Sequence, residues 1–308
     1  MTFTRFSRVR LLDLRVGRFF AASGELDTSR ARTTMPGMDA KNKGPSGLAE
    51  REPGIHVSIR AAFPEDGSYD WHDALAIYER VGAVEVAFYR LQLFLERVAV
   101  EDVVAPFSTL SLRATSVHMA QARIGQFDEF LAVLHKTVPI AQALNCRLVV
   151  THPTNARLVD VEQKIASAVD PLLAQAGVTL CWETFAGRRR FLSGIEGIAA
   201  FCRGRPHHAA CYDTSHLHKP QAEVLTDVAS YADCIRCFHL SNRGPQSGQQ
   251  HLPLRHPQGV LDFEAILAAI AESSFNGPLT LEYLPQFHDQ LVVDALWAQA
   301  ALYRVASG

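Results

Sequence analysis

The sequence predicts a closed (β/α)8 TIM barrel of the α/β class, preceded by an N-terminal extension. From residue 51 onward, short apolar or β-branched runs alternate with longer stretches of helical period. Eight such strand–helix units fit into about 255 residues, the size of a typical (β/α)8 barrel. The short runs are apolar throughout, as expected of parallel strands buried on both faces. A doubly wound open sheet is the alternative, but no glycine-rich phosphate loop follows the first run.

The predicted elements follow one another in a regular order. The eight strands are the runs of apolar and β-branched residues at 55–59, 84–88, 115–118, 147–151, 178–182, 209–212, 235–239 and 279–281. Helices are predicted where apolar residues recur three and four positions apart, at residues 71–81, 127–144, 159–175, 195–201, 263–273 and 291–305. This alternation of strands and helices is the order that a barrel of parallel strands requires.

Composition and charge exclude several classes of protein. The chain has 308 residues, of which 48% are hydrophobic and 20% charged, so a disordered or collagen-like protein is excluded. No apolar run approaches the roughly 20 residues of a bilayer-spanning helix, and we predict no membrane segment. The formal net charge of −2 argues against a protein whose affinity comes from contacting many phosphates.

Residues 1–50 are predicted to be a flexible or lightly docked extension, separate from a single barrel domain at residues 51–308. They hold nine basic and five acidic side chains, which leaves a net charge of −6 on the barrel. The extension ends in a stretch rich in Thr, Gly, Pro, Lys and Ser, which is typical of a linker. A transit peptide is the alternative. The extension could also begin upstream of a native start at Met35 or Met38. The acidic barrel predicts a small-molecule substrate and no nucleic acid.

The six cysteines lack the dense spacing of a secreted disulfide scaffold, so the predicted compartment is a reducing cytoplasm. Cys234 and Cys237 form a lone Cys-x-x-Cys pair, which could be redox-active or half of a zinc site. There is no second pair, and Cys237 lies in an apolar run. Ordinary buried thiols are therefore the prediction.

Six successive strands are predicted to end in His, Asp or Glu, at His118, His152, Glu183, Asp213, His239 and Glu282. In a (β/α)8 barrel, the carboxyl ends of the strands form the face that carries the active site. One such residue is usually an ordinary loop residue, but six in succession are hard to explain in that way. Because side chains alternate across a strand, Glu183 should point toward the barrel axis with Cys181, and Trp182 toward the helices.

These side chains predict a divalent metal, because converging carboxylates and imidazoles are unfavourable unless a cation neutralises them. The oxygen-rich set, suited to Mn, Mg or Co and acceptable to Zn, is Glu183, Asp213, His239 and Glu282. His118 and His152 would add a nitrogen-rich second site that shares Glu183 and favours zinc. Both a one-metal and a two-metal centre are consistent with the sequence.

Several short motifs, each weak alone, occur in a characteristic order between residues 54 and 303. They are Val117-His118-Met119, Val150-Thr151-His152-Pro153, Cys181-Trp182-Glu183-Thr184, Tyr212-Asp213-Thr214-Ser215-His216, Phe238-His239-Leu240-Ser241-Asn242 and Leu281-Glu282-Tyr283. In these motifs the sequence resembles the xylose isomerase-like TIM-barrel superfamily, which contains sugar isomerases, sugar 3-epimerases and endonuclease IV-type enzymes. The resemblance implies that the shared metal ligands are Glu183, Asp213, His239 and Glu282.

The resemblance also implies a substrate-binding set of His216, Arg243 and His251. Sugar epimerases have a run similar to the Ser-Asn-Arg-Gly around Arg243. In the endonuclease-like pattern, an Asp-x-His pair helps to hold a third zinc, but here Gln249 replaces that Asp. A neutral amide is a poorer zinc ligand, so we expect no full three-zinc site. Arg255, in an inserted loop, either contacts an anionic group of the substrate or is an exposed loop charge.

The first functional hypothesis is a divalent-metal-dependent isomerase or epimerase of a sugar or sugar-like polyol. Glu183 and Glu282 would remove and return a proton through an enediolate. Trp182, Phe88 or Phe185 would stack on the sugar or, as is more common for such aromatics, pack in the core.

The alternative is a zinc-dependent hydrolase of a small-molecule phosphodiester or a related bond, with zinc held by His118, His152 and Glu183. A third hypothesis is a barrel that has lost catalysis and binds a partner, but the complete four-ligand set argues against it. A homodimer is possible, because exposed helices around a barrel commonly pair.

Overall fold

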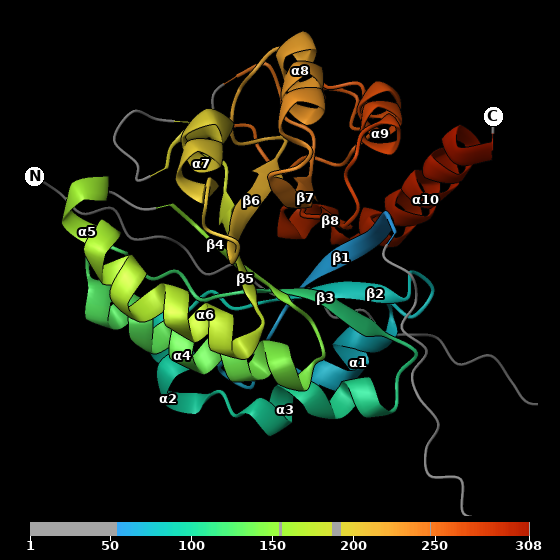
Figure 1. The fold of residues 1–308 in the computed structure, drawn as a ribbon. Coiled ribbons are helices and arrows are strands. Elements are labelled where there is room, and N and C mark those ends of the chain that lie inside the picture. The colour runs from blue at the N-terminus through green and yellow to red at the C-terminus, as the bar shows by residue number, and fades with distance from the viewer. Residues whose placement is uncertain (1–53, 154–155, 187–191, 247, 308) are drawn as a thin grey trace, which may run out of the picture. The chain divides into compact units, whose positions relative to one another are not determined.

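Eight parallel strands form a closed barrel in sequence order, and β1 pairs with β8 to close it (Figure 1). The computed structural model describes residues 54–153, 156–186, 192–246 and 248–307, so the predicted extension lies outside the described residues. The strands are β1 (His56–Ala62), β2 (Ala83–Ala87), β3 (Arg113–His118), β4 (Leu148–Thr151), β5 (Thr179–Glu183), β6 (His208–Asp213), β7 (Ile235–Leu240) and β8 (Pro278–Leu281). The (β/α)8 barrel predicted from the sequence is confirmed.

Helices follow the strands and surround the barrel (Figure 1). They are α1 (Trp71–Ala76), α2 (Leu91–Arg97), α3 (Val100–Val104), α4 (Phe127–Ala143), α5 (Leu158–Lys164), α6 (Asp170–Ala176), α7 (Gly194–Cys202), α8 (Gln221–Tyr231), α9 (Phe263–Glu272) and α10 (Leu291–Ser307). A helix lies in each of the six predicted ranges. The segments α2, α3 and α8 are helices that were not among the predicted ones.

The helix predicted at residues 159–175 is divided by one π turn. The π turn, Ile165–Val169, lies between α5 and α6 and continues directly into both. Pro171 follows it and has no N–H to donate, so regular i to i−4 bonding cannot continue through this point. The helix ends at Gly177, which has φ +65° and caps the last turn in the left-handed conformation.

Apolar side chains form two separate packed groups. The larger group lies between the strands and the helices and includes Trp182, which stacks on Phe130 with ring centroids 6.1 Å apart. The smaller group consists of Val150, Cys181, Ala209, Cys211 and Cys237. Because strand side chains alternate, Cys181, Cys211 and Cys237 share a face of their strands with Glu183, Asp213 and His239. The smaller group therefore forms a layer beneath those three polar residues.

The predictions for the cysteines and for the membrane can be compared with the described residues. All six cysteines are free thiols, and Cys237 is fully buried as predicted. No helix among the described residues has both the length and the apolar character needed to span a bilayer.

Candidate metal centre

The six predicted strand-end residues lie together at the carboxyl end of the barrel, within three groups that could each hold a metal ion. Within each group, one ligand atom per residue lies within 4.8 Å of the others. The largest group, which we call the four-residue group, is Glu183, Asp213, His239 and Glu282. The other two groups are His118, His152 and Glu183, and Asp213, His216 and His251. Glu183 and Asp213 each belong to two groups, so adjacent groups share a carboxylate.

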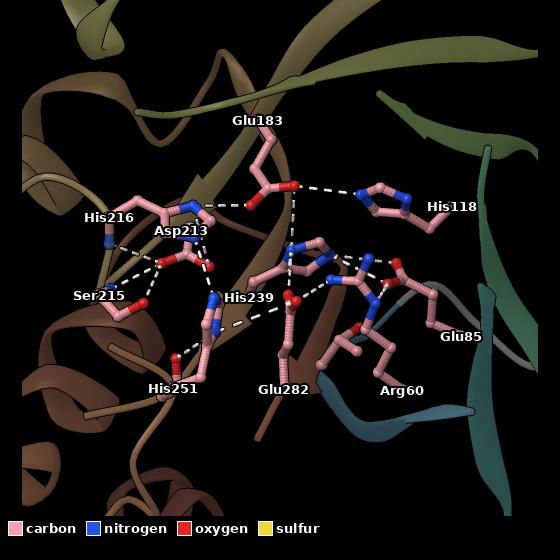
Figure 2. Close-up of polar contacts among 12 residues, drawn as sticks. Arg60, Glu85, His118, Glu183, Asp213, Ser215, His216, His239, His251 and Glu282 are labelled. Carbon is pink, nitrogen blue, oxygen red and sulfur yellow. Dashed lines mark hydrogen bonds and ion pairs between the residues drawn. The ribbon is translucent and has the colours of Figure 1, made fainter. Parts of the chain in front are cut away.

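Glu183 ends β5 and is surrounded by imidazoles (Figure 2). Its Oε2 lies 3.2 Å from His118 Nε2 and 3.1 Å from His152 Nε2, while its Oε1 lies 2.9 Å from His216 Nδ1. The side chain is fully buried. Burial alone would raise the pKa of Glu183, but the neighbouring imidazoles of His152, His239 and His118 hold it well below the usual range. Glu183 is therefore a carboxylate at neutral pH, with both oxygens facing imidazoles.

Asp213 ends β6 with one oxygen fully occupied and the other free of hydrogen bonds. Its Oδ1 accepts the backbone N–H groups of Ser215 and His216, at 2.7 and 2.9 Å, and the Ser215 hydroxyl at 2.9 Å. These bonds come from the turn that follows β6, so the local chain fixes the orientation of the carboxylate. Asp213 Oδ2, which is buried and lacks a hydrogen-bond partner, is left as the ligand atom.

His239 and Glu282 complete the four-residue group from β7 and from the residue after β8. His239 Nδ1 lies 3.0 Å from Glu282 Oε2 and 3.6 Å from Glu183 Oε2. Burial opposes charge on His239, but the carboxylates of Glu85 and Glu183 outweigh it and raise its pKa well above the usual value. These carboxylates thus favour the protonated form of His239.

Four buried atoms without hydrogen bonds indicate that a cation would fit the four-residue group. Buried side-chain atoms without a hydrogen-bond partner include one from each member: Glu183 Oε1, Asp213 Oδ2, His239 Nδ1 and Glu282 Oε2. Buried polar atoms normally have partners, and unsatisfied ones indicate an ion or a water that completes the site. Three carboxylates and one imidazole are a donor set that Mn, Mg, Co and Zn all accept. The residues present therefore fit a divalent metal.

His118 and His152 lie on the other side of Glu183, with their ring centroids 4.7 Å apart. The Nδ1 of His118 donates to the Met119 carbonyl at 3.1 Å, which leaves Nε2 to face Glu183. Burial and the charge of Arg60 lower the pKa of His118 to about 4, despite the nearby carboxylate of Glu183. His118 is therefore neutral at pH 7, which is the form that binds a metal.

His216 and His251 form the third group with Asp213. Their Nε2 atoms are 3.0 Å apart, and His251 Nδ1 lies 3.3 Å from the Ser241 hydroxyl. Burial opposes charge on His216, but Asp213 and Glu183 raise its pKa to about 9. The side chain of Gln249 lies elsewhere, accepting the Gln246 N–H at 3.3 Å and packing so closely on Gly244 that a Cβ there would clash. The third group thus has Asp213 as its carboxylate, and Gln249 is not one of its members.

Arg243 and Arg255 lie apart from the three groups. Arg243 is buried and donates to the Lys219 carbonyl, and no hydrogen bond among the described residues joins it to a candidate ligand. Arg255 forms an ion pair with Asp294 at 2.9 Å and lies over Trp297, 5.1 Å from the ring centroid. Arg255 is exposed in its loop, which agrees with the second alternative predicted for it, and its charge is also paired within the protein.

Of the three aromatic residues considered for stacking, Phe185 packs its ring against imidazoles of the groups. It stacks on His216 with centroids 3.9 Å apart and meets His152 edge-on at 5.1 Å. Trp182 points away from the barrel axis, as predicted, and donates to His208 Nδ1 at 3.0 Å. Phe88 packs in the core against Phe94, with centroids 4.6 Å apart. Phe88 contacts His118 through its backbone N–H, which donates to the His118 carbonyl at 3.0 Å.

Two charged residues of the site were not predicted, Arg60 in β1 and Glu85 in β2 (Figure 2). Arg60 forms ion pairs with Glu282 and, at 3.7 Å, with Glu85. Glu85 lies 3.1 Å from His239 Nε2 and accepts the Ser116 hydroxyl at 2.6 Å. A signal existed in the sequence: a charge in the middle of a buried strand is costly unless it is paired.

Solved structures with the same fold include metal-binding proteins and sugar epimerases. An IolI protein with a bound zinc atom is 14% identical, covering 82% of this chain and 98% of that one, with a TM-score of 0.58. A D-allulose 3-epimerase from Methylomonas sp., in complex with D-allulose, is 18% identical, with coverages of 83% and 97% and a TM-score of 0.58. A xylose isomerase-like TIM barrel protein from Mycobacterium smegmatis, in complex with magnesium, is 16% identical, with coverages of 83% and 97% and a TM-score of 0.57.

At these identities the likeness establishes the fold. A search of curated proteins found no match. Residues 98–299, about two thirds of the sequence, match the family described as "Xylose isomerase-like TIM barrel". The chain therefore belongs to the xylose isomerase-like TIM-barrel family.

Proposed function

We propose that this protein is a metal-dependent hydrolase of a small-molecule phosphodiester or a related bond, with two divalent metals for which Glu183 would be a shared ligand. The observation that carries the proposal is the position of Glu183, which belongs both to the four-residue group and to the group with His118 and His152. In two-metal hydrolases the metals lie about 3.5–4 Å apart and act on one substrate bond. Two ligand groups that have one carboxylate in common support a centre of this kind.

In this proposal each metal has its own ligands besides Glu183. The first would be held by Asp213 Oδ2, His239 Nδ1 and Glu282 Oε2, and the second by the Nε2 atoms of His118 and His152. Divalent metals held in this way supply Lewis acidity and a water of lowered pKa as nucleophile.

The chain's own residues would supply the proton for the leaving group. His216 Nε2 and His251 Nε2 are close enough to share one proton. The raised pKa of His216 keeps that proton in place at neutral pH. We propose that this pair donates it to the departing oxygen, as a general acid. Phe185, stacked on His216, shields the pair from solvent on one side.

A small substrate is favoured over nucleic acid by charge. Residues 51–308 carry a net charge of −6, whereas proteins that bind nucleic acid tightly neutralise phosphates with clusters of Lys and Arg.

An isomerase or epimerase of a sugar is the second candidate. The four-residue group favours it, because one metal held there has Glu183 and Glu282 as flanking carboxylates. That reaction requires both carboxylates to exchange protons with a carbon atom. The surroundings argue against it, since Arg60 pairs with Glu282 and imidazoles face both oxygens of Glu183. Burial alone would raise the pKa of Glu282, but Arg60 and His239 keep this pKa well below the usual range. A carboxylate with a lowered pKa is a weaker base.

Activity assays on the full chain separate the two candidates. Zinc- or manganese-loaded protein is incubated with bis(p-nitrophenyl) phosphate and a panel of small phosphodiesters, and in parallel with a panel of ketohexoses. We expect hydrolysis, and we expect Glu183→Gln to abolish it. The Trp182→Phe variant serves as control, because Trp182 faces the helices. Interconversion of ketohexoses without phosphodiester hydrolysis would establish the epimerase instead.

A further inference from the structure

We infer that Glu85 is a positioning residue for the metal centre, which holds His239 so that its Nδ1 faces the four-residue group. The inference rests on the proposed metal centre but not on the reaction catalysed there. Among the described residues, Glu85 is the only buried carboxylate in contact with His239 that belongs to none of the three metal groups.

The contacts of His239 define which of its nitrogens can bind a metal (Figure 2). Its Nε2 donates to Glu85 Oε2 at 3.2 Å and lies 3.1 Å from Glu85 Oε1, so this ring nitrogen faces the Glu85 carboxylate. Its Nδ1, on the opposite side of the ring, lies beside Glu282 and Glu183 without a hydrogen-bond partner. A metal ligand must present a nitrogen without a proton. Glu85 fixes the proton on Nε2 and leaves Nδ1 for the metal.

Glu85 is itself held rigidly. The Ser116 hydroxyl donates to its Oε2 at 2.6 Å, and the Nε of Arg60 lies 3.7 Å from its Oε1. The side chain is fully buried in β2, where an unpaired carboxylate would be strongly unfavourable.

Arg60 links Glu85 to the metal ligands. Its Nη1 pairs with Glu282 Oε1, which leaves Glu282 Oε2 directed at His239 Nδ1. The buried Arg60 guanidinium thus contacts both the candidate ligand Glu282 and Glu85, the carboxylate that faces His239. Arg60 and Glu85 together thus orient two of the four ligands, from strands that supply no ligand themselves.

The test compares zinc binding by metal-free wild-type protein, Glu85→Gln and Glu85→Leu, by calorimetric titration against a competing chelator. Gln keeps an acceptor for the His239 N–H without the charge, whereas Leu removes the acceptor. We expect zinc binding at the four-residue group to weaken from wild type to Gln to Leu, with a loss of about 10- to 100-fold for Leu. The visible spectrum of the cobalt(II)-loaded protein should change in Leu, because His239 no longer presents Nδ1.

A matched control is Asp170→Asn. Asp170 accepts from His208 Nε2 at 2.7 Å, so this change breaks a carboxylate–histidine pair whose histidine is in none of the metal groups. Its zinc affinity should equal that of wild type. If Glu85 has a purely structural role, the folded variants should have lowered thermal stability but unchanged zinc affinity and an unchanged cobalt spectrum. That result would overturn the inference. If Leu does not fold, Gln decides by the same two readouts. Wild-type protein that binds no zinc would overturn the proposed centre as well.

Discussion

The substitution Asp213→Asn isolates one metal-ligand atom with little other change. The Oδ1 of Asp213 already accepts from Ser215 N–H, Ser215 hydroxyl and His216 N–H, and the oxygen of Asn can keep these three bonds. Only Oδ2 becomes an NH2 group, which cannot coordinate a cation. The variant should therefore fold, and it should lose one of the four ligands of the four-residue group.

The expected rise in Tm on adding zinc follows from the linkage between metal binding and folding. Zinc at 100 times its dissociation constant stabilises the wild-type protein by about 2.7 kcal/mol. For a barrel of this size, about 2–4 °C per kcal/mol gives a rise in Tm of about 5–11 °C. If the lost ligand weakens binding about 100-fold, the same zinc concentration stabilises Asp213→Asn by only about 0.4 kcal/mol, or about 1–2 °C.

Differential scanning calorimetry of both proteins, with and without zinc, measures these shifts. The reasoning would be refuted if Asp213→Asn folded and its Tm rose with zinc as much as that of wild type. In that case the orphan Oδ2 of Asp213 is not a metal ligand.

Three further results are expected. The double variant His118→Ala, His152→Ala should lose one metal per chain in elemental analysis and keep the other, because the four-residue group does not include these imidazoles. Zinc affinity, measured between pH 6.5 and 8, should rise about tenfold per pH unit. The raised pKa of His239 favours its protonated form in the metal-free protein, and zinc must displace that proton. A zinc affinity that does not depend on pH would contradict this prediction. Trp182→Phe should lower the free energy of unfolding in urea by about 1–3 kcal/mol, because His208 Nδ1 loses its buried donor, while activity stays unchanged.

The barrel could be predicted because its signal is repeated eight times along the chain. Each strand is a short apolar run, and each predicted helix has a face of apolar residues. The helix α8 was overlooked because its buried side chains are few, and one of them is Asp227, which accepts from the Tyr212 hydroxyl at 2.8 Å. Polar residues with partners of this kind disrupt an apolar pattern without disrupting the helix.

The candidate ligands could be predicted because they lie at strand ends, where polar residues stand out beside apolar runs. Arg60 and Glu85 lie two residues before the ends of β1 and β2, inside stretches that otherwise look like core. Arg60 and Glu85 lie opposite each other on the neighbouring strands β1 and β2. The contact of Glu85 with His239 and that of Arg60 with Glu282 depend on the closure of the barrel, which brings distant strands together. The sequence contains the unusual buried charges but not the contacts that make them favourable.

The metal content of wild-type protein and of Glu183→Gln, purified without chelators, tests the role of Glu183 as a shared ligand most directly. Because Glu183 belongs to two ligand groups, we predict about two metals per chain in the wild-type protein and the loss of both in the variant. A wild-type protein with a single metal, or a Glu183→Gln variant that keeps two, would contradict the two-metal centre.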